Sequence, residues 1–156
     1  GGVPIAGGAF IGEHSFSTTA TPTAAGRPDA GDMQVAETFG REIREKIRSV
    51  PDRGPLSEVN VPGTHPYRGS PALWTVDFIA VSDRCRSCGL CAEVCPAGAI
   101  DPGRSSSINQ EACITCCACI RRCPVHAREM KPGLVMEASE RLSTLYPEPK
   151  VPEYYL

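Results

Sequence analysis

The sequence lacks the features that would direct it to a membrane, to nucleic acid or to secretion. No apolar run reaches the roughly 18 residues that a membrane-spanning helix needs. The formal net charge is only −2 over 156 residues, so charge alone predicts no strong attraction to nucleic acid. The apolar start of the chain is rich in glycine and has no basic segment before it, unlike a signal peptide. We therefore expect a cytoplasmic protein.

Cysteine is absent from both ends of the chain, and all nine cysteines lie between Cys85 and Cys123. A secreted disulfide framework normally has an even number of cysteines and a signal peptide. Because neither is seen, disulfide bonds are the weakest explanation for this concentration of sulfur. A zinc site and an iron–sulfur cluster remain, and the spacing of the cysteines has to distinguish them.

The cysteine-rich region is an internal repeat. A shift of 28 residues (113 − 85) places one copy on the other, so that Cys85, Cys88, Cys91, Cys95 and Pro96 fall on Cys113, Cys116, Cys119, Cys123 and Pro124. Similarity at one fixed offset indicates two copies of one structural unit, which we expect to be related by a pseudo-two-fold axis. The tripeptides AID after the first copy and SIN before the second are predicted strands of a small antiparallel sheet.

Each copy has the pattern C-x2-C-x2-C-x3-C-P, which suits a [4Fe–4S] cluster. Three thiolates at this spacing can bind three corners of the cubane. The fourth cysteine, predicted at the start of a short helix, binds the cluster of the other copy. The pattern therefore predicts two clusters, with ligands Cys85, Cys88, Cys91 and Cys123 for cluster one and Cys113, Cys116, Cys119 and Cys95 for cluster two.

Zinc is the alternative metal for a group of thiolates. Structural zinc sites usually have two C-x2–4-C pairs separated by a longer loop. Here a third cysteine follows each pair after two residues, and the fourth precedes a proline. The pattern therefore favours iron–sulfur clusters over zinc.

Three residues of the second copy have no assigned role. Cys117 stands where the first copy has Gly89, and two clusters need no ninth sulfur. We interpret Cys117 as a small buried thiol near cluster two; an alternative ligand after cluster damage and a redox-sensitive thiol are the other interpretations. Arg121 and Arg122 are either solvated helix positions or a docking patch for an acidic partner.

The segments CRSCGLCAEVCPAGAID and INQEACITCCACIRRCPVHA resemble the bacterial ferredoxins that hold two [4Fe–4S] clusters, and the resemblance covers residues 77–130. It implies a small α+β fold, in which strand–helix–strand repeats form antiparallel hairpins. It also implies low-potential one-electron transfer to redox protein partners. No catalytic residue is implied, because such a protein relays electrons.

The first half of the chain shows two predicted elements. Residues 1–12 have the apolar and small side chains of a buried strand. Residues 32–49 have the periodicity of an amphipathic helix, which Asp29 or Asp32 can cap. The apolar face of this helix carries Val35, Ala36, Phe39, Ile43 and Ile47.

Further elements follow in the second half. Residues 51–74 are interrupted by proline and glycine and are predicted to be a linker, and TVDFIAV is a short alternating strand. Residues 134–145 predict a second amphipathic helix, whose apolar face carries Leu134, Ala138, Leu142 and Leu145. The predicted domains are therefore residues 1–50, 51–74, 75–131 and 132–156.

The first 50 residues resemble the last strand and last helix of a flavodoxin-like α/β domain. GAFIGEHSFST, AAGRPDAGD, VPGTHPYRG, the doubled cysteine of CITCCAC and the terminal PEYYL resemble the C-terminal part of flavodoxin–ferredoxin fusion proteins of anaerobic microbes. The resemblance implies an incomplete flavodoxin-like domain, since its FMN-binding segments are not in this chain. FMN is expected as a cofactor only if that part is present, and the initial glycine fits a partial chain.

The leading prediction is an electron-transfer module, free or fused to a flavodoxin-like domain. A full-length flavin-dependent oxidoreductase that uses the clusters to conduct electrons is one alternative. A cluster-based redox sensor that uses Cys117 is another. Whether the whole protein is an enzyme depends on the presence of the FMN-binding half.

Overall fold

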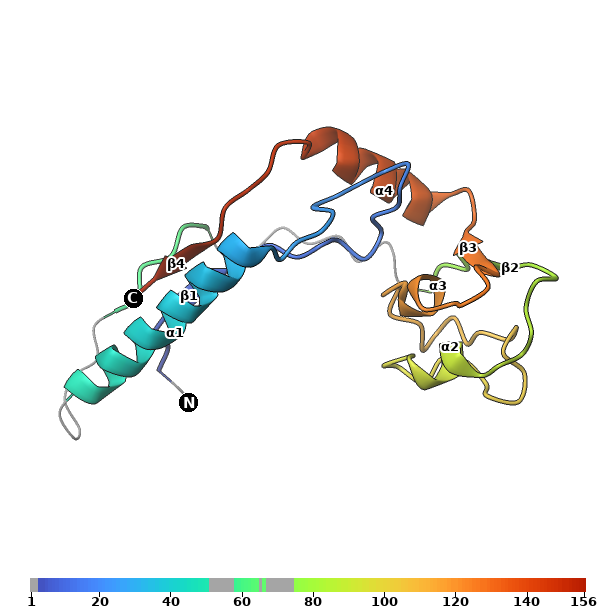
Figure 1. Ribbon diagram of the computed structural model, residues 1–156, viewed down its shortest axis with the longest axis horizontal. Coiled ribbons are helices and arrows are strands. Elements are labelled where there is room, and N and C mark those ends of the chain that lie inside the picture. The colour runs from blue at the N-terminus through green and yellow to red at the C-terminus, as the bar shows by residue number, and fades with distance from the viewer. Residues whose placement is uncertain (1–2, 51–57, 65, 67–74) are drawn as a thin grey trace. The chain divides into compact units, whose positions relative to one another are not determined.

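The computed structural model describes residues 3–50, 58–64, 66 and 75–156 (Figure 1). Its contacts divide the chain into two compact units. Unit 1 comprises residues 1–13, 24–68 and 148–156, and unit 2 comprises residues 14–23 and 69–147. Most of the predicted linker falls outside the described residues. Among the helices that are described, none is long and apolar enough to cross a bilayer.

The predicted first helix is confirmed as α1, Ala30–Ser49, in unit 1. Asp29 caps its start, because the Asp29 carboxylate accepts the N–H of Asp32 at 3.0 Å. In return, the Asp32 carboxylate accepts the N–H of Asp29 at 2.8 Å. This reciprocal capping box satisfies N–H groups that have no partner within the helix. Arg27 donates two further hydrogen bonds to the Asp32 carboxylate, which is buried.

The predicted strand at the start of the chain is shorter than expected and is not buried. Strand β1, Gly7–Ala9, pairs antiparallel with strand β4, Glu153–Tyr155. The prediction of a buried strand over residues 1–12 is therefore wrong, because a partner of three residues supports only a short strand, and Gly8 and Ala9 are exposed. No strand was predicted in the tail, although its adjacent tyrosines, Tyr154 and Tyr155, favour strands.

Unit 1 buries very little apolar surface. Phe39 of α1 contacts Phe10 and Tyr154, with ring centroids 5.6 and 5.0 Å apart. Among the described residues of unit 1, Asp32 alone is buried, and the apolar Ile47 of α1 is exposed. One helix and a two-stranded sheet seldom provide enough burial for independent stability.

Unit 2 contains the predicted antiparallel pairings. Strand β2, Ile79–Val81, pairs with strand β3, Arg128–Met130. Ile100 and Ile108 form an isolated antiparallel bridge. TVDFIAV is therefore confirmed as a strand over its last three residues, whereas AID and SIN meet in the predicted antiparallel sense through a single bridge and do not form strands.

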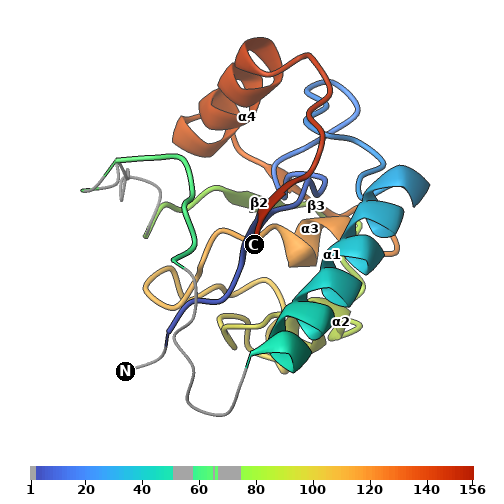
Figure 2. The ribbon, with the colours of Figure 1, turned by 90° about the vertical axis from the view of Figure 1, so that its left-hand side faces the viewer.

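The two cysteine copies carry matching short helices. Helices α2, Leu90–Glu93, and α3, Ala118–Arg121, are related by the same shift of 28 residues (118 − 90). They contact each other in unit 2 (Figure 2). Cys95 and Cys123 follow these helices and do not begin one, so the predicted place of the fourth cysteine is corrected. Each helix ends before the proline that follows the fourth cysteine, because proline cannot continue a helix.

The two copies exchange backbone hydrogen bonds. The N–H of Asn109, before the second copy, donates to the carbonyl of Ala99, after the first, at 2.8 Å. The N–H of Ser82, before the first copy, donates to the carbonyl of Ala127, after the second, at 2.9 Å. Neither copy therefore completes its pairing alone.

The predicted second helix is confirmed as α4, Leu134–Leu145, and its predicted face is confirmed in part: Ala138 and Leu142 pack against the core, but Leu145 is exposed. Leu134 is 54% exposed, whereas Val135 and Ser139 are buried. The reason is that the hydroxyl of Ser139 donates to the carbonyl of Phe16 at 2.8 Å, which turns the serine inward. A buried face that is predicted from the apolar positions of the helix could not include Ser139.

Residues 14–23 belong to unit 2, far upstream of the cysteines. Phe16 is 6% exposed and lies in the hydrophobic core of this unit. The guanidinium of Arg121, in α3, donates to the carbonyls of His14 and Ser17 at 3.1 and 3.2 Å. The folded unit around the cysteines therefore extends beyond the repeat, while the domain limits taken from the sequence stay predictions.

We predict that Phe16→Ala destabilises unit 2. Truncation of a buried phenylalanine typically costs about 3–5 kcal/mol. The variant should therefore lose the visible absorbance of the expected clusters at a lower guanidinium concentration than the wild-type protein. Phe10→Ala is the control, because Phe10 lies in unit 1 and is exposed. Equal effects of the two substitutions would contradict the placement of residues 14–23.

We also predict an acid-sensitive start of α1. The hydrogen bond from Arg27 lowers the pKa of Asp32, against the opposing effect of burial. A lowered folded-state pKa stabilises the fold above the unfolded value, about 3.9, and this stabilisation is lost as the pH falls through the folded value. Asp32→Asn should reduce helicity at neutral pH and remove this part of the acid dependence, as measured by far-ultraviolet circular dichroism. Glu37→Gln, at an exposed position of α1, is the control, and identical acid profiles for Asp32→Asn and wild type would contradict the prediction.

Candidate metal centre

Four of the predicted ligands line one cavity of unit 2. Cys95 comes from the first copy, and the other three come from the second: Cys113, Cys116 and Cys119. The remaining walls are Cys117 and the apolar side chains of Phe78, Ile79, Ala99, Ile100, Ile108 and Ile114. Within residues 75–156, all of which are described, no three Cys, His, Asp or Glu side chains converge closely enough to hold a single metal ion. Instead of converging on a single ion, the four cysteines line the wall of the cavity.

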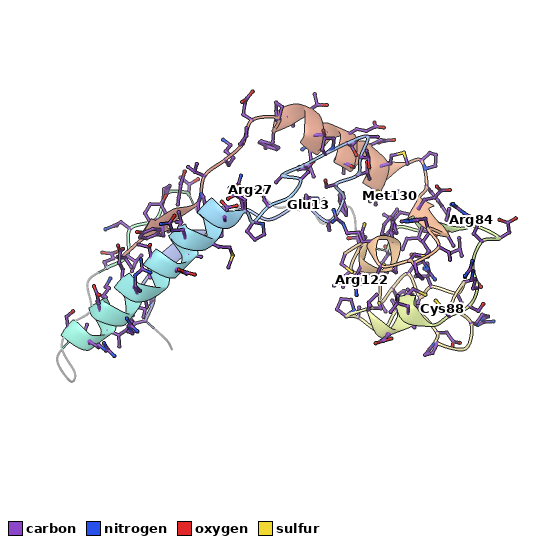
Figure 3. The ribbon with its side chains drawn as sticks, viewed as in Figure 1. Glu13, Arg27, Arg84, Cys88, Arg122 and Met130 are labelled. Carbon is purple, nitrogen blue, oxygen red and sulfur yellow. The ribbon has the colours of Figure 1, made fainter. Side chains whose placement is uncertain are left out.

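The other four predicted ligands lie at the α2 side of unit 2. Cys91 is buried within α2, and Cys123 follows α3, which contacts α2. Cys85 is half-buried, whereas Cys88 is the one exposed cysteine of the nine (Figure 3). All nine cysteines are free thiols.

Both cysteine loops are bent into the left-handed conformation at matching positions. The φ angle is +52° at Ser87 and +54° at Thr115. Two residues further on, φ is +80° at Gly89 and +56° at Cys117. Such values are unusual for a β-branched threonine. Because turns of this kind aim successive N–H groups into an anion-binding concavity, the distortion fits an anionic iron–sulfur group in each loop.

The fourth cysteine of each copy accepts a backbone hydrogen bond. The N–H of Ala99 donates to the sulfur of Cys95 at 3.3 Å, and that of Ala127 donates to the sulfur of Cys123 at 3.2 Å. Burial raises the pKa of Cys123, but neighbouring backbone N–H groups and the charge of Arg128 outweigh burial, so the pKa lies below its usual value. Such hydrogen bonds favour the thiolate, which is the form that binds metal.

A buried arginine lies beside the cysteines and was missed from the sequence. Arg128, the first residue of β3, is 4% exposed. Its Nη2 donates to the carbonyl of Ser105, and its Nη1 has no hydrogen-bond partner in the described part of the chain. Burial raises the pKa of the Cys119 thiol, while the charge and hydrogen bond of Arg128 act in the opposite direction. The cysteine motif gave no signal for this arginine, because Arg128 lies after the repeat and belongs to no motif.

Cys117 is 2% exposed and lines the same cavity. Its S–H donates to the carbonyl of Thr115 at 3.8 Å. Burial, together with the neighbouring Cys119 and Cys116, raises the pKa of Cys117 to about 12. Cys117 is therefore a protonated thiol at neutral pH, which favours the interpretation of a packing residue over that of a redox-sensitive thiol.

Both arginines of the predicted docking patch are exposed, and Arg122 is labelled in Figure 3. Arg121 also donates to two carbonyls of residues 14–23, so its guanidinium has partners within unit 2. The docking patch stays a prediction.

The profile of the 4Fe-4S dicluster domain matches residues 78–124, which contain all nine cysteines. Residues 78–124 form a ferredoxin-type iron–sulfur domain. No solved structure matches the chain. The ferredoxin-type domain holds at least one iron–sulfur cluster, and its chemistry is electron transfer. The matched residues end before β3, so Arg128, α4 and residues 14–23 lie outside the match.

We predict that Cys117→Ser keeps the iron content of the wild-type protein, because the ninth sulfur is a packing group. Cys116→Ser, a substitution at the adjacent position, should lose iron because it removes a predicted ligand. The measurement is iron and acid-labile sulfide per chain, under anaerobic conditions. Loss of iron from Cys117→Ser would contradict the assignment of Cys117 as a packing residue.

Proposed function

We propose that this chain transfers single electrons at low potential through two [4Fe–4S] clusters. Cluster one is held by Cys85, Cys88, Cys91 and Cys123, and cluster two by Cys113, Cys116, Cys119 and Cys95. The observation that carries the proposal is the cavity in which Cys95 of the first copy lies among three cysteines of the second. A fourth ligand contributed by the opposite copy is the arrangement that the spacing predicts.

The assignment of cluster one rests on the repeat. Cys123 follows α3 as Cys95 follows α2, and each sulfur accepts the N–H of the alanine four residues on. The exchanged hydrogen bonds of Ala99 and Ala127 tie the end of each copy to the start of the other. The same geometry therefore supports an exchanged ligand for both clusters.

The clusters supply the change in oxidation state, and the surrounding residues set how readily it occurs. Hydrogen bonds to the sulfurs, burial and net charge are the main controls on the potential of such a group. Here the apolar side chains around cluster two, among them Phe78, Ile100 and Ile108, keep water away from the negative charge that reduction adds to the cluster. These walls favour a low potential. Cys88, the exposed ligand of cluster one, offers a protein partner the shortest approach to the metal.

We further propose that unit 1 is the last strand and helix of a flavodoxin-like domain. The support for this proposal is that unit 1 has almost no core. Asp32 alone is buried among the residues described there, and Ile47 of α1 is exposed. In that arrangement FMN is the cofactor of the remaining part, and electrons pass between FMN and the clusters. This chain provides the iron–sulfur half of the pathway.

The proposal predicts that the two copies lose metal together. Cys95→Ser and Cys123→Ser each remove the residue that ties one copy to the other, so either variant should lower the occupancy of both clusters. Anaerobic titration with dithionite should show two electrons taken up per wild-type chain, one for each cluster, and fewer in both variants. Full occupancy of both clusters in Cys95→Ser would show that the exchanged ligand assignment is wrong.

A further inference from the structure

The interior of unit 2 contains a positive charge, Arg128, that no carboxylate of the described residues compensates. Arg128 is the one Lys or Arg residue among the buried residues of the described chain, and it is 4% exposed. A buried charge is costly unless it is paired and hydrogen-bonded. In the described residues, no Asp or Glu forms an ion pair with Arg128.

The hydrogen bonds of Arg128 satisfy only part of the guanidinium. Nη2 donates to the carbonyl of Ser105, which carries no full charge. Nη1, although buried, has no hydrogen-bond partner within the described residues. Most buried polar groups in proteins are satisfied, so an unsatisfied guanidinium nitrogen indicates a partner other than the described residues.

Arg128 lies next to elements that carry cysteine ligands. It is the first residue of β3, which packs against α3, the helix that carries Cys119, a proposed ligand of cluster two. The preceding residue, Ala127, donates its N–H to the sulfur of Cys123, a proposed ligand of cluster one, at 3.2 Å. One buried cation is therefore close to a ligand of each cluster.

We propose that Arg128 is the counter-charge of the clusters and raises their reduction potential, an inference that rests on the proposed function. A cubane with four thiolates is an anion, and one electron from a reductant adds one further negative charge. A fixed positive charge therefore stabilises the reduced form more than the oxidised form. The effect is strong because charges interact more strongly in the interior than in water. Arg128 acts through the ligand sulfurs and is a positioning residue.

The test is an anaerobic reductive titration of the full chain, loaded with its clusters and monitored by electron paramagnetic resonance. Arg128→Gln keeps hydrogen-bonding capacity and removes the charge. We expect its reduction to become about tenfold less favourable, which corresponds to a shift of about 59 mV to more negative potential for a one-electron couple. Arg128→Lys keeps the charge and should restore most of the shift.

Arg122→Gln is the matched control. It removes one positive charge next to Cys123 in sequence, but from an exposed position, where solvent screens the interaction. Its effect on the potential should be much smaller than that of Arg128→Gln. Equal shifts in the two variants would show that net charge matters and the buried position does not, which would overturn the inference.

Iron content separates the remaining outcomes. Wild-type potentials in a fully loaded Arg128→Gln variant would overturn the inference and leave the proposed function intact. Iron loss from Arg128→Gln but not from Arg128→Lys would support it, because charge alone then decides whether the clusters are held. Iron loss from both variants would overturn it in favour of a packing role. A wild-type chain that binds no iron would overturn the proposed function itself.

Discussion

The backbone exchange between the two cysteine copies is the constraint on which unit 2 depends. Ser82 and Asn109 each donate to a carbonyl of the other copy, and Cys95 lies among the cysteines of that copy. Neither copy can therefore form a closed structure alone. A domain this small buries little apolar surface, so a metal cluster at its centre contributes directly to folding.

The packing around the repeat comes from segments that lie far away in the sequence. Phe16 enters the hydrophobic core, and Ser139 of α4 donates to the Phe16 carbonyl. Arg121 of α3 reaches the same upstream segment through two carbonyls. These contacts fix the outer face of α3, the helix that carries Cys119. Through these long-range contacts, the packing around the cysteines draws on both halves of the chain.

The sequence could predict whatever depends on local spacing. The repeat of 28 residues, the capping of α1 by Asp29 and the bounds of α4 follow from patterns that short segments carry. The buried face of α4 could be predicted only in part: Ala138 and Leu142 pack against the core, but Ser139 is turned inward by the carbonyl of Phe16. Strand β4 was missed for a similar reason, since it exists only through pairing with β1. Arg128 shows the same limit for the site: its burial results from tertiary packing, and no motif contains it.

The most direct test of the central claim is to count iron and acid-labile sulfide in anaerobically purified protein and to record the electron paramagnetic resonance spectrum after reduction with dithionite. The account predicts about eight iron atoms per chain, four for each of two [4Fe–4S] clusters. It also predicts a broadened signal from two paramagnetic clusters that interact across unit 2. Stoichiometric zinc, or a spectrum without signal from a protein whose cysteines are paired in disulfides, would contradict it.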